Sequence, residues 1–88
     1  MTQLPEAEAT ERGLREQIAD LVTARARAEG EARRLRARAE HIDPALLEVA
    51  ERYTAQAGRL AQEVEGLRGI LRQQEVRTEQ LRADRAGA

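Results

Sequence analysis

A repeat of mostly apolar residues runs through nearly the whole chain and constrains its fold more than any other feature. Its members alternate between spacings of four and three; they are Leu14, Ile18, Leu21, Arg25, Ala28, Ala32, Leu35, Ala39 and Ile42, then Leu46, Val49, Tyr53, Ala57, Leu60, Val64, Leu67, Leu71, Gln74, Thr78 and Leu81. A repeat of about 3.5 residues places one stripe of side chains along a helix, as in the seam of a coiled coil. The step from Tyr53 to Ala57 departs from the alternation, as an inserted four that locally unwinds a supercoil. The repeat predicts an all-α fold.

The helical pattern is interrupted at His41-Ile42-Asp43-Pro44. Asp is a good N-cap, Pro is favoured at the first helical position, and a Pro pushes the residue before it out of the α region. We therefore predict a helix over about residues 5–40, a turn at 41–44, and a second helix over about 44–85. The phase of the repeat continues across Pro44, which favours the alternative of one continuous helix. That alternative leaves a Pro inside a helix, at a cost of about 3 kcal/mol.

The two arms have nearly equal lengths, roughly 55 and 60 Å, so each can cover the other to its end. Residues 1–19 carry four Glu and two Arg, a net charge of −2, whereas residues 66–85 carry five Arg and three acidic residues, a net charge of +2. These segments lie side by side in a hairpin, where exposed ion pairs favour a register more than they add stability. We predict an antiparallel two-helix hairpin, a coiled coil, that forms a single domain over residues 1–88.

The composition predicts a thin core. Ala, Leu, Glu and Arg account for 55 of the 88 residues, and only nineteen residues are large and apolar, with Tyr53 the single aromatic. Ordering a chain costs about 1.5 kcal/mol per residue, which these side chains cannot offset by themselves. We therefore expect a lone hairpin to be marginally stable and to associate with a partner or with itself.

The second helix carries more apolar residues than one seam uses. Leu47 and Val76 flank the stripe on one side and Ile70 flanks it on the other, which calls for a further helix. We predict a homodimer of hairpins, a four-helix bundle. The candidate partner interface comprises Leu47, Tyr53, Leu60, Val64, Leu67, Ile70, Leu71 and Val76, with the stretch from Leu60 to Leu71 at the centre of the dimer.

The composition also bears on function. The chain has no Cys and no Ser, which excludes disulfides, thiolate metal sites and serine nucleophiles. It has no apolar run of about 18 residues and no apolar stretch near Met1 that resembles a signal peptide. Its net charge of −1 argues against a dedicated nucleic-acid binder. We expect a cytoplasmic, non-enzymatic protein with no cofactor, no metal and no small-molecule substrate.

Three local features each allow two interpretations. The stretch Arg25–Arg38 holds six Arg and two Glu, and forms either an anion-binding patch or a solvated face; its Arg25, Arg33 and Arg36 lie nearest the seam. His41 and the acidic residues around the turn suit a metal poorly, because a lone His supplies too few fixed ligands. The glycines at 58, 66 and 69 indicate either a close approach of another helix or a flexible point, or else neutral exposed positions.

Residues 42–71 begin with Ile42-Asp43-Pro44 and continue with Leu47, Ala50, Tyr53, Ala57, Leu60, Val64, Leu67 and Leu71 at helical spacing. This segment resembles the opening helix of actinobacterial type VII secretion substrates, which are small helical-hairpin proteins. The resemblance covers about a third of the chain and implies export without a signal peptide. The W-x-G turn of that family is absent here, and Ala57 stands where its Tyr-x-x-x-Asp/Glu export signal has an acid.

These observations support two classes of function. The first is a bacterial regulatory or adaptor protein that presents a helix face to a protein partner. The second is a structural subunit that assembles with itself.

Overall fold

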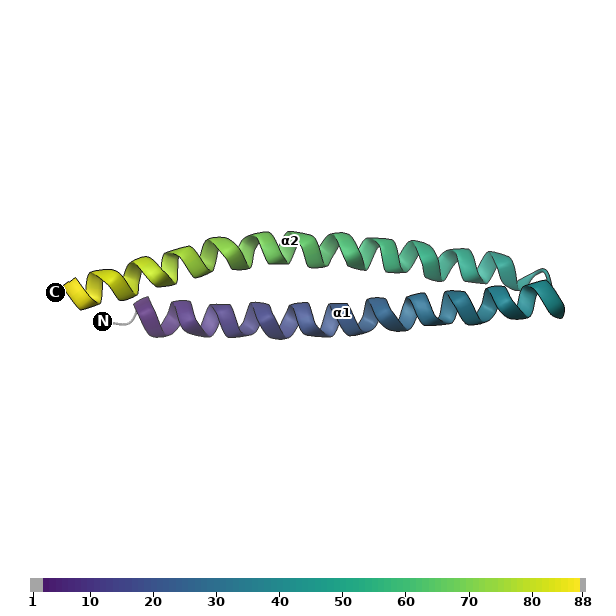
Figure 1. The fold of residues 1–88 in the computed structure, drawn as a ribbon, viewed down its shortest axis with the longest axis horizontal. Coiled ribbons are helices and arrows are strands. Elements are labelled where there is room, and N and C mark those ends of the chain that lie inside the picture. Colours follow the sequence, from purple (N-terminus) through teal and green to yellow (C-terminus); the bar gives the residue numbers. More distant parts are fainter. Residues whose placement is uncertain (1–2, 88) are drawn as a thin grey trace.

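The computed structural model describes residues 3–87, which form two α-helices joined by a tight turn (Figure 1). Helix α1 spans Gln3–His41 and helix α2 spans Leu46–Gly87. The helices lie antiparallel, so that the start of α1 is beside the end of α2. The hairpin measures 69 × 14 × 13 Å, whereas one continuous helix of this chain would be about 130 Å long. The predicted antiparallel hairpin is confirmed, and the alternative of a continuous helix is wrong.

Helix α1 ends through hydrogen bonds to a single carbonyl. The Ile42 and Asp43 N–H groups both donate to the Arg38 carbonyl oxygen, at 2.7 and 3.3 Å. These bonds satisfy an acceptor that the end of a helix otherwise leaves unpaired. Within residues 3–87 no residue has a positive φ angle. The chain therefore reverses direction without the left-handed glycine that often ends a helix.

The start of helix α2 is capped by the side chain of Asp43, as the sequence predicts. The Asp43 carboxylate accepts a hydrogen bond from the Ala45 N–H at 3.0 Å. The Leu46 and Leu47 N–H groups donate to the carbonyls of Asp43 and Pro44, both at 3.1 Å. These first bonds span three residues, so the regular helix starts at Leu46 and not at the predicted Pro44.

The seam between the helices is built largely from alanine. The buried residues of α1 are Ala7, Glu11, Ala28, Ala32, Leu35 and Ala39, and those of α2 are Ala50, Ala57, Val64 and Thr78. The large seam residues Leu14, Ile18, Leu21, Leu60, Leu67 and Leu71 are half-buried along its edges. Small side chains let two helices approach closely but bury little apolar surface. The described core is accordingly thin.

Ala50, and not Val49, occupies the seam at the start of α2. Ala50 is 0% exposed, whereas Val49 is half-buried. With Ala50 included, the steps from Leu46 through Tyr53 to Ala57 alternate regularly, so the predicted irregularity in the repeat is wrong. Hydrophobicity ranks valine above alanine, but the helical alternation places the smaller side chain against α1.

The ends of the predicted α1 seam also differ from expectation. Ile42 is 72% exposed because it lies in the turn, after the chain has left the helical path. At the other end the seam continues past Leu14 to Glu11 and Ala7, which are both buried. The alternation of three and four persists there, although one of its members is charged.

The glycines of α2 do not mark a close helix contact. A Cβ atom added at Gly58 or Gly66 meets no atom within 4 Å, and one at Gly69 lies 3.8 Å from the Arg72 guanidinium. Each position therefore has room for a side chain, and the interpretation of these glycines as points of close approach within the hairpin is wrong.

Candidate interaction surfaces

The side chains that bridge the two helices define one side of the hairpin. Among residues 3–87 these contacts join Arg36 to Thr54, Arg15 to Glu75 at 3.0 Å, and Arg82 to Glu8 at 3.1 Å. The two members of every pair lie equally far along the chain from Ala45. On each helix the bridging residues are separated by multiples of seven, so they share one position of the 3.5-residue repeat. We call this the bridged side.

Two polar residues are buried in the seam near the open end of the hairpin, away from the turn. Glu11 is 5% exposed, and its carboxylate accepts a hydrogen bond from Arg15 at 3.3 Å. Thr78 is fully buried, and its hydroxyl donates to the Gln74 carbonyl at 2.9 Å. Polar seam residues favour one register at some cost in stability. The sequence placed Thr78 in the seam, but the burial of Glu11 was missed; the signal for it was the alternation extended back from Leu14.

Near the open end, the ion pairs between the helices can be compared with the net charges of the two segments that meet there. The Glu8 carboxylate, hydrogen-bonded to Arg82, raises the pKa of that guanidinium. This pair has the predicted polarity, with the acid on α1. The pair between Arg15 and Glu75 has the opposite polarity. The net charges of the two segments therefore agree with their placement side by side but do not determine each contact.

The large apolar side chains that stay exposed in the described part of the chain lie on α2 and in the turn. On α2 they are Leu47, Ile70 and Val76, which are 44%, 52% and 60% exposed. Leu47 directly follows the seam residue Leu46, and Ile70 directly precedes the seam residue Leu71. Val76 lies midway between two seam positions and so faces away from α1. The three residues therefore surround α2 and do not form one strip.

The other residues of the predicted partner interface pack within the hairpin. Val64 is 0% exposed, so it cannot contact a partner while the hairpin is intact, and its prediction as an interface residue is wrong. Tyr53, Leu60, Leu67 and Leu71 are half-buried in the same seam. Val64 looked available from the sequence because the apolar stripe of α2 is wide; α1 uses the middle of that stripe.

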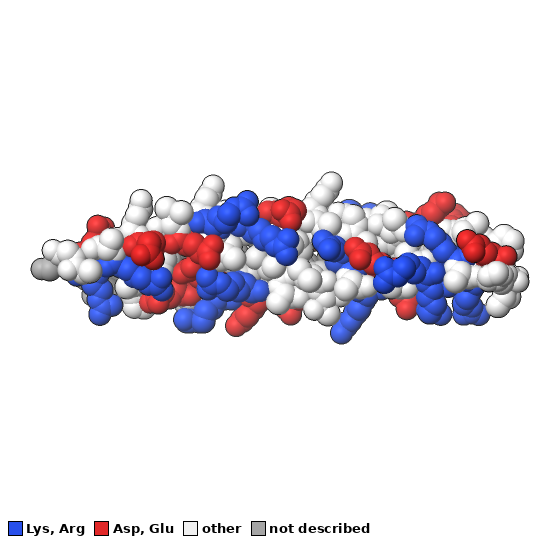
Figure 2. Space-filling model, in the orientation of Figure 1, with Lys and Arg blue, Asp and Glu red and all other residues white. Residues whose placement is uncertain are grey.

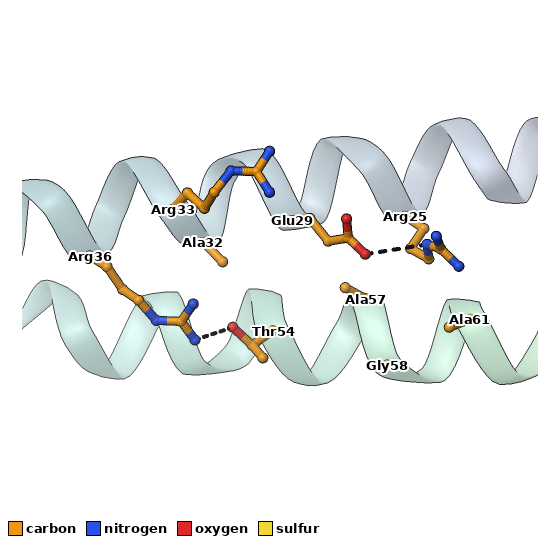
Figure 3. A pocket seen from close by; sticks show the side chains of 9 residues that line it. All are labelled: Arg25, Glu29, Ala32, Arg33, Arg36, Thr54, Ala57, Gly58 and Ala61. Atoms are coloured by element: carbon orange, nitrogen blue, oxygen red, sulfur yellow. Dashed lines mark hydrogen bonds and ion pairs between the residues drawn. The ribbon is translucent and has the colours of Figure 1, made fainter.

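A shallow groove of about 450 Å³ runs between the helices in the half of the hairpin nearer the turn (Figure 3). We call it the arginine groove. Its lining residues are Arg25, Glu29, Ala32, Arg33 and Arg36 from α1 and Thr54, Ala57, Gly58 and Ala61 from α2. Long charged side chains of α1 thus face small residues of α2. The prediction that Arg25, Arg33 and Arg36 lie near the seam is confirmed.

The groove has more positive than negative charge. Arg25 pairs with Glu29 at 3.3 Å, and Arg36 donates a hydrogen bond to the neutral Thr54 hydroxyl. The Arg33 side chain forms no hydrogen bond or ion pair with any residue between 3 and 87. Three arginines against one glutamate leave a net charge of +2 in the lining.

Glu31, which lies beside Tyr53 and Gln56 of α2, pairs with a basic residue of its own helix. Arg34 contacts Glu31 one turn away, at 2.6 and 3.4 Å. The hydrogen bond from Arg34 lowers the pKa of Glu31, and the Glu31 carboxylate raises the pKa of Arg34. Figure 2 shows the wider pattern, in which basic and acidic side chains alternate along the visible face of the rod.

Between residues 3 and 87, no three His, Asp or Glu side chains are placed to hold a metal ion. Neither α1 nor α2 has a stretch apolar enough to cross a bilayer. The Ile42-Asp43-Pro44 segment, which carries the resemblance to type VII secretion substrates, forms the turn. Comparisons with models of protein families, with curated proteins and with solved structures found no match.

Proposed function

We propose that this protein is a non-enzymatic protein–protein interaction module, a regulatory or adaptor protein that presents α2 to a helical partner. The observation that carries the proposal is the distribution of exposed apolar side chains. Leu47, Ile70 and Val76 all lie on α2. We place the module in the cytoplasm as part of the same proposal.

The energetics favour a partner for α2. Fully burying a Leu, Ile or Val side chain stabilises a complex by about 1.5–3 kcal/mol relative to leaving it in water. The three exposed side chains are each about half exposed and lie on different sides of α2, so a helix packed against one side of α2 removes the apolar surface on that side from water. Because the seam is mostly alanine, the hairpin itself buries comparatively little. Burial of apolar surface against a partner therefore stabilises the hairpin as well as the complex.

The test compares two triple variants in the native host. One carries Leu47→Gln, Ile70→Gln and Val76→Gln on α2. The matched control carries Ala19→Gln, Ala26→Gln and Ala37→Gln at exposed positions of α1. Circular dichroism first checks that both remain helical. Cross-linking in cells is then expected to recover the same partner with the wild type and the control, and to lose it with the α2 variant. Equal recovery with all three proteins contradicts the proposal.

A second copy of the chain is the alternative partner, and the thin alanine seam favours it. Two hairpins that pack through α2 form the predicted homodimer and four-helix bundle, with contacts through whichever of Leu47, Ile70 and Val76 lie on the packed side of α2. Light scattering across concentration tests this alternative. A constant mass of twice the monomer supports the dimer, growth with concentration supports a self-assembling subunit, and a monomer at all micromolar concentrations excludes both.

A further inference from the structure

We propose that the arginine groove binds an acidic helical segment of a partner protein. This inference rests on the proposed function and adds the chemistry of the partner. The partner segment binds on the bridged side of the hairpin, in the groove between α1 and α2. It is recognised through the positive charge that the hairpin itself leaves unbalanced.

Charge is the first argument. The lining has a net charge of +2, and within residues 3–87 Arg33 has no acidic partner. Arg36 donates to a neutral hydroxyl, so its charge is also not balanced by a carboxylate there. Arginine suits this role because its planar guanidinium binds carboxylates through paired hydrogen bonds. A partner that supplies carboxylates therefore complements the groove.

The shape of the floor favours a helix as the occupant. Ala57, Gly58 and Ala61 present almost no side chain on the α2 side, as Figure 3 shows. A Cβ atom at Gly58 meets nothing within 4 Å, so the space above it is open. An amphipathic helix that lies in a groove inserts side chains at spacings of three and four residues. The small residues leave room for those side chains.

The spacing of the arginines favours an extended ligand over a single anion. Arg25, Arg33 and Arg36 are separated by about 12 and 4.5 Å along the axis of α1. In Figure 3, Arg25 and Arg36 lie at opposite ends of the groove and are engaged with Glu29 and Thr54. An isolated phosphate requires arginines that converge on one point, and these arginines do not. Carboxylates on successive turns of a helix match this arrangement.

Two features of the lining disfavour nucleic acid. The groove contains no aromatic side chain on which a base can stack. It does contain Glu29, whose carboxylate repels a continuous row of phosphates. A peptide helix can place its acidic residues beside Arg33 and Arg36 and a neutral residue beside Glu29.

The groove also leads toward an exposed apolar side chain. Ala61, Thr54 and Leu47 recur every seven residues along α2, so they lie on the same side of that helix. Leu47 is 44% exposed and lies closest to the turn. A helix in the groove that extends toward the turn therefore meets Leu47 with an apolar residue about two turns beyond its acidic residues.

The experiment selects helical peptides from a randomised phage-displayed library against the intact protein and measures their affinities by fluorescence anisotropy. We expect the selected peptides to share a stripe of Glu or Asp. The variant Arg33→Glu with Arg36→Glu is expected to weaken their binding at least about tenfold, which corresponds to about 1.4 kcal/mol. Peptides with Glu changed to Lys are expected to bind this variant and not the wild type. The control Arg12→Glu with Arg77→Glu makes the same charge change at exposed positions outside the groove.

A second pair of variants tests the groove without changing its charge. Gly58→Leu fills the floor, and Gly66→Leu adds the same side chain where it also meets no neighbour but lies outside the groove. Only Gly58→Leu is expected to weaken peptide binding, with the helix content of both variants unchanged. Inorganic phosphate and a single-stranded oligonucleotide serve as competitors, and neither is expected to displace the peptide at a comparable charge concentration.

Several results overturn the inference. These are selected peptides without an acidic stripe, equal binding by the charge-reversed variant, no effect of Gly58→Leu, or displacement by the oligonucleotide. If the selected peptides instead lose affinity on Ile70→Gln or Val76→Gln, the groove assignment fails while the proposed function stands. If no peptide binds any face of the folded hairpin, the groove assignment and the proposed function both lose their support.

Discussion

Arg15 and Glu75 lie sixty residues apart in the sequence and form a 3.0 Å ion pair near the open end of the hairpin. Arg15 also donates a hydrogen bond to the buried carboxylate of Glu11 at 3.3 Å. One guanidinium therefore connects the seam to the opposite helix. The turn aligns the helices at one end, and this contact favours the same register at the other.

A double-mutant cycle of Arg15→Ala and Glu75→Ala is expected to give a coupling energy of about 0.2–1 kcal/mol, since both side chains are partly exposed. Arg15→Ala is expected to cost more than Glu75→Ala, because it also removes the partner of the buried Glu11. Urea unfolding provides the measurement. The control is the Glu48 and Arg52 pair, which is 4.0 Å apart and well exposed. Equal coupling in the two cycles contradicts the prediction.

Val64→Ala is expected to lower the free energy of unfolding by about 2 kcal/mol. Val64 is 0% exposed, so the change removes buried apolar surface and leaves a cavity. Val76→Ala makes the same chemical change at a side chain that is 60% exposed, and its effect is expected within about 0.5 kcal/mol. Thermal or urea unfolding of the two variants checks the difference. Similar losses mean that Val76 is also buried in solution, as a dimer through α2 requires.

Ala50→Leu is expected to destabilise the hairpin by about 1–3 kcal/mol, because the larger side chain overfills a fully buried position of the seam. Ala55→Leu, at an exposed position of α2, is the matched control and is expected to be nearly neutral. Calorimetric melting temperatures distinguish the two. A stabilising Ala50→Leu means that the helices do not approach closely there.

Asp43→Ala is expected to lower the free energy of unfolding by about 0.5–2 kcal/mol, because the Ala45 N–H loses its side-chain acceptor. Asp43→Asn retains an oxygen acceptor and is expected to preserve most of the stability. Asp20→Ala removes an exposed carboxylate from the interior of α1 and serves as the control. If Asp43→Asn is as damaging as Asp43→Ala, the cap is not the reason for the loss.

The carboxyl group of Glu31 is expected to titrate below the ordinary pKa of a glutamate, because Arg34 hydrogen-bonds to its charged form. Such a group stabilises the folded state above its unfolded pKa, and that contribution is lost as the pH falls through the lower folded pKa. A carbon-detected NMR titration measures it. In Arg34→Ala the pKa of Glu31 is expected to rise, and an unchanged value contradicts the assignment.

Much of the fold follows from local sequence features. The Asp43-Pro44 restart predicted the position of the turn, and the alternating repeat predicted most seam residues. Two kinds of seam residue were missed. The predicted repeat included Val49 in place of its neighbour Ala50, and it began at Leu14, so it did not reach Glu11. Both follow the alternation, so spacing was a better guide here than hydrophobicity.

The candidate surfaces were predicted less well than the fold. Leu47, Ile70 and Val76 are exposed, as the surplus width of the apolar stripe of α2 indicated. Val64 belongs to the same stripe, but it is covered by α1. Which part of a wide stripe remains free depends on where the other helix lies across it. A single-helix pattern does not contain that information.

The sequence by itself determined two long helices, their antiparallel return at Asp43-Pro44 and a seam rich in alanine. These properties depend on residues close together in the chain, through capping, proline geometry and helical periodicity. Only the tertiary structure decided that Arg15 meets Glu75, that Glu11 is buried, and that Arg33 and Arg36 line one groove with Gly58. Those relationships depend on the register and rotation of one helix against the other, which are set by the summed packing of both seams and not by any single segment.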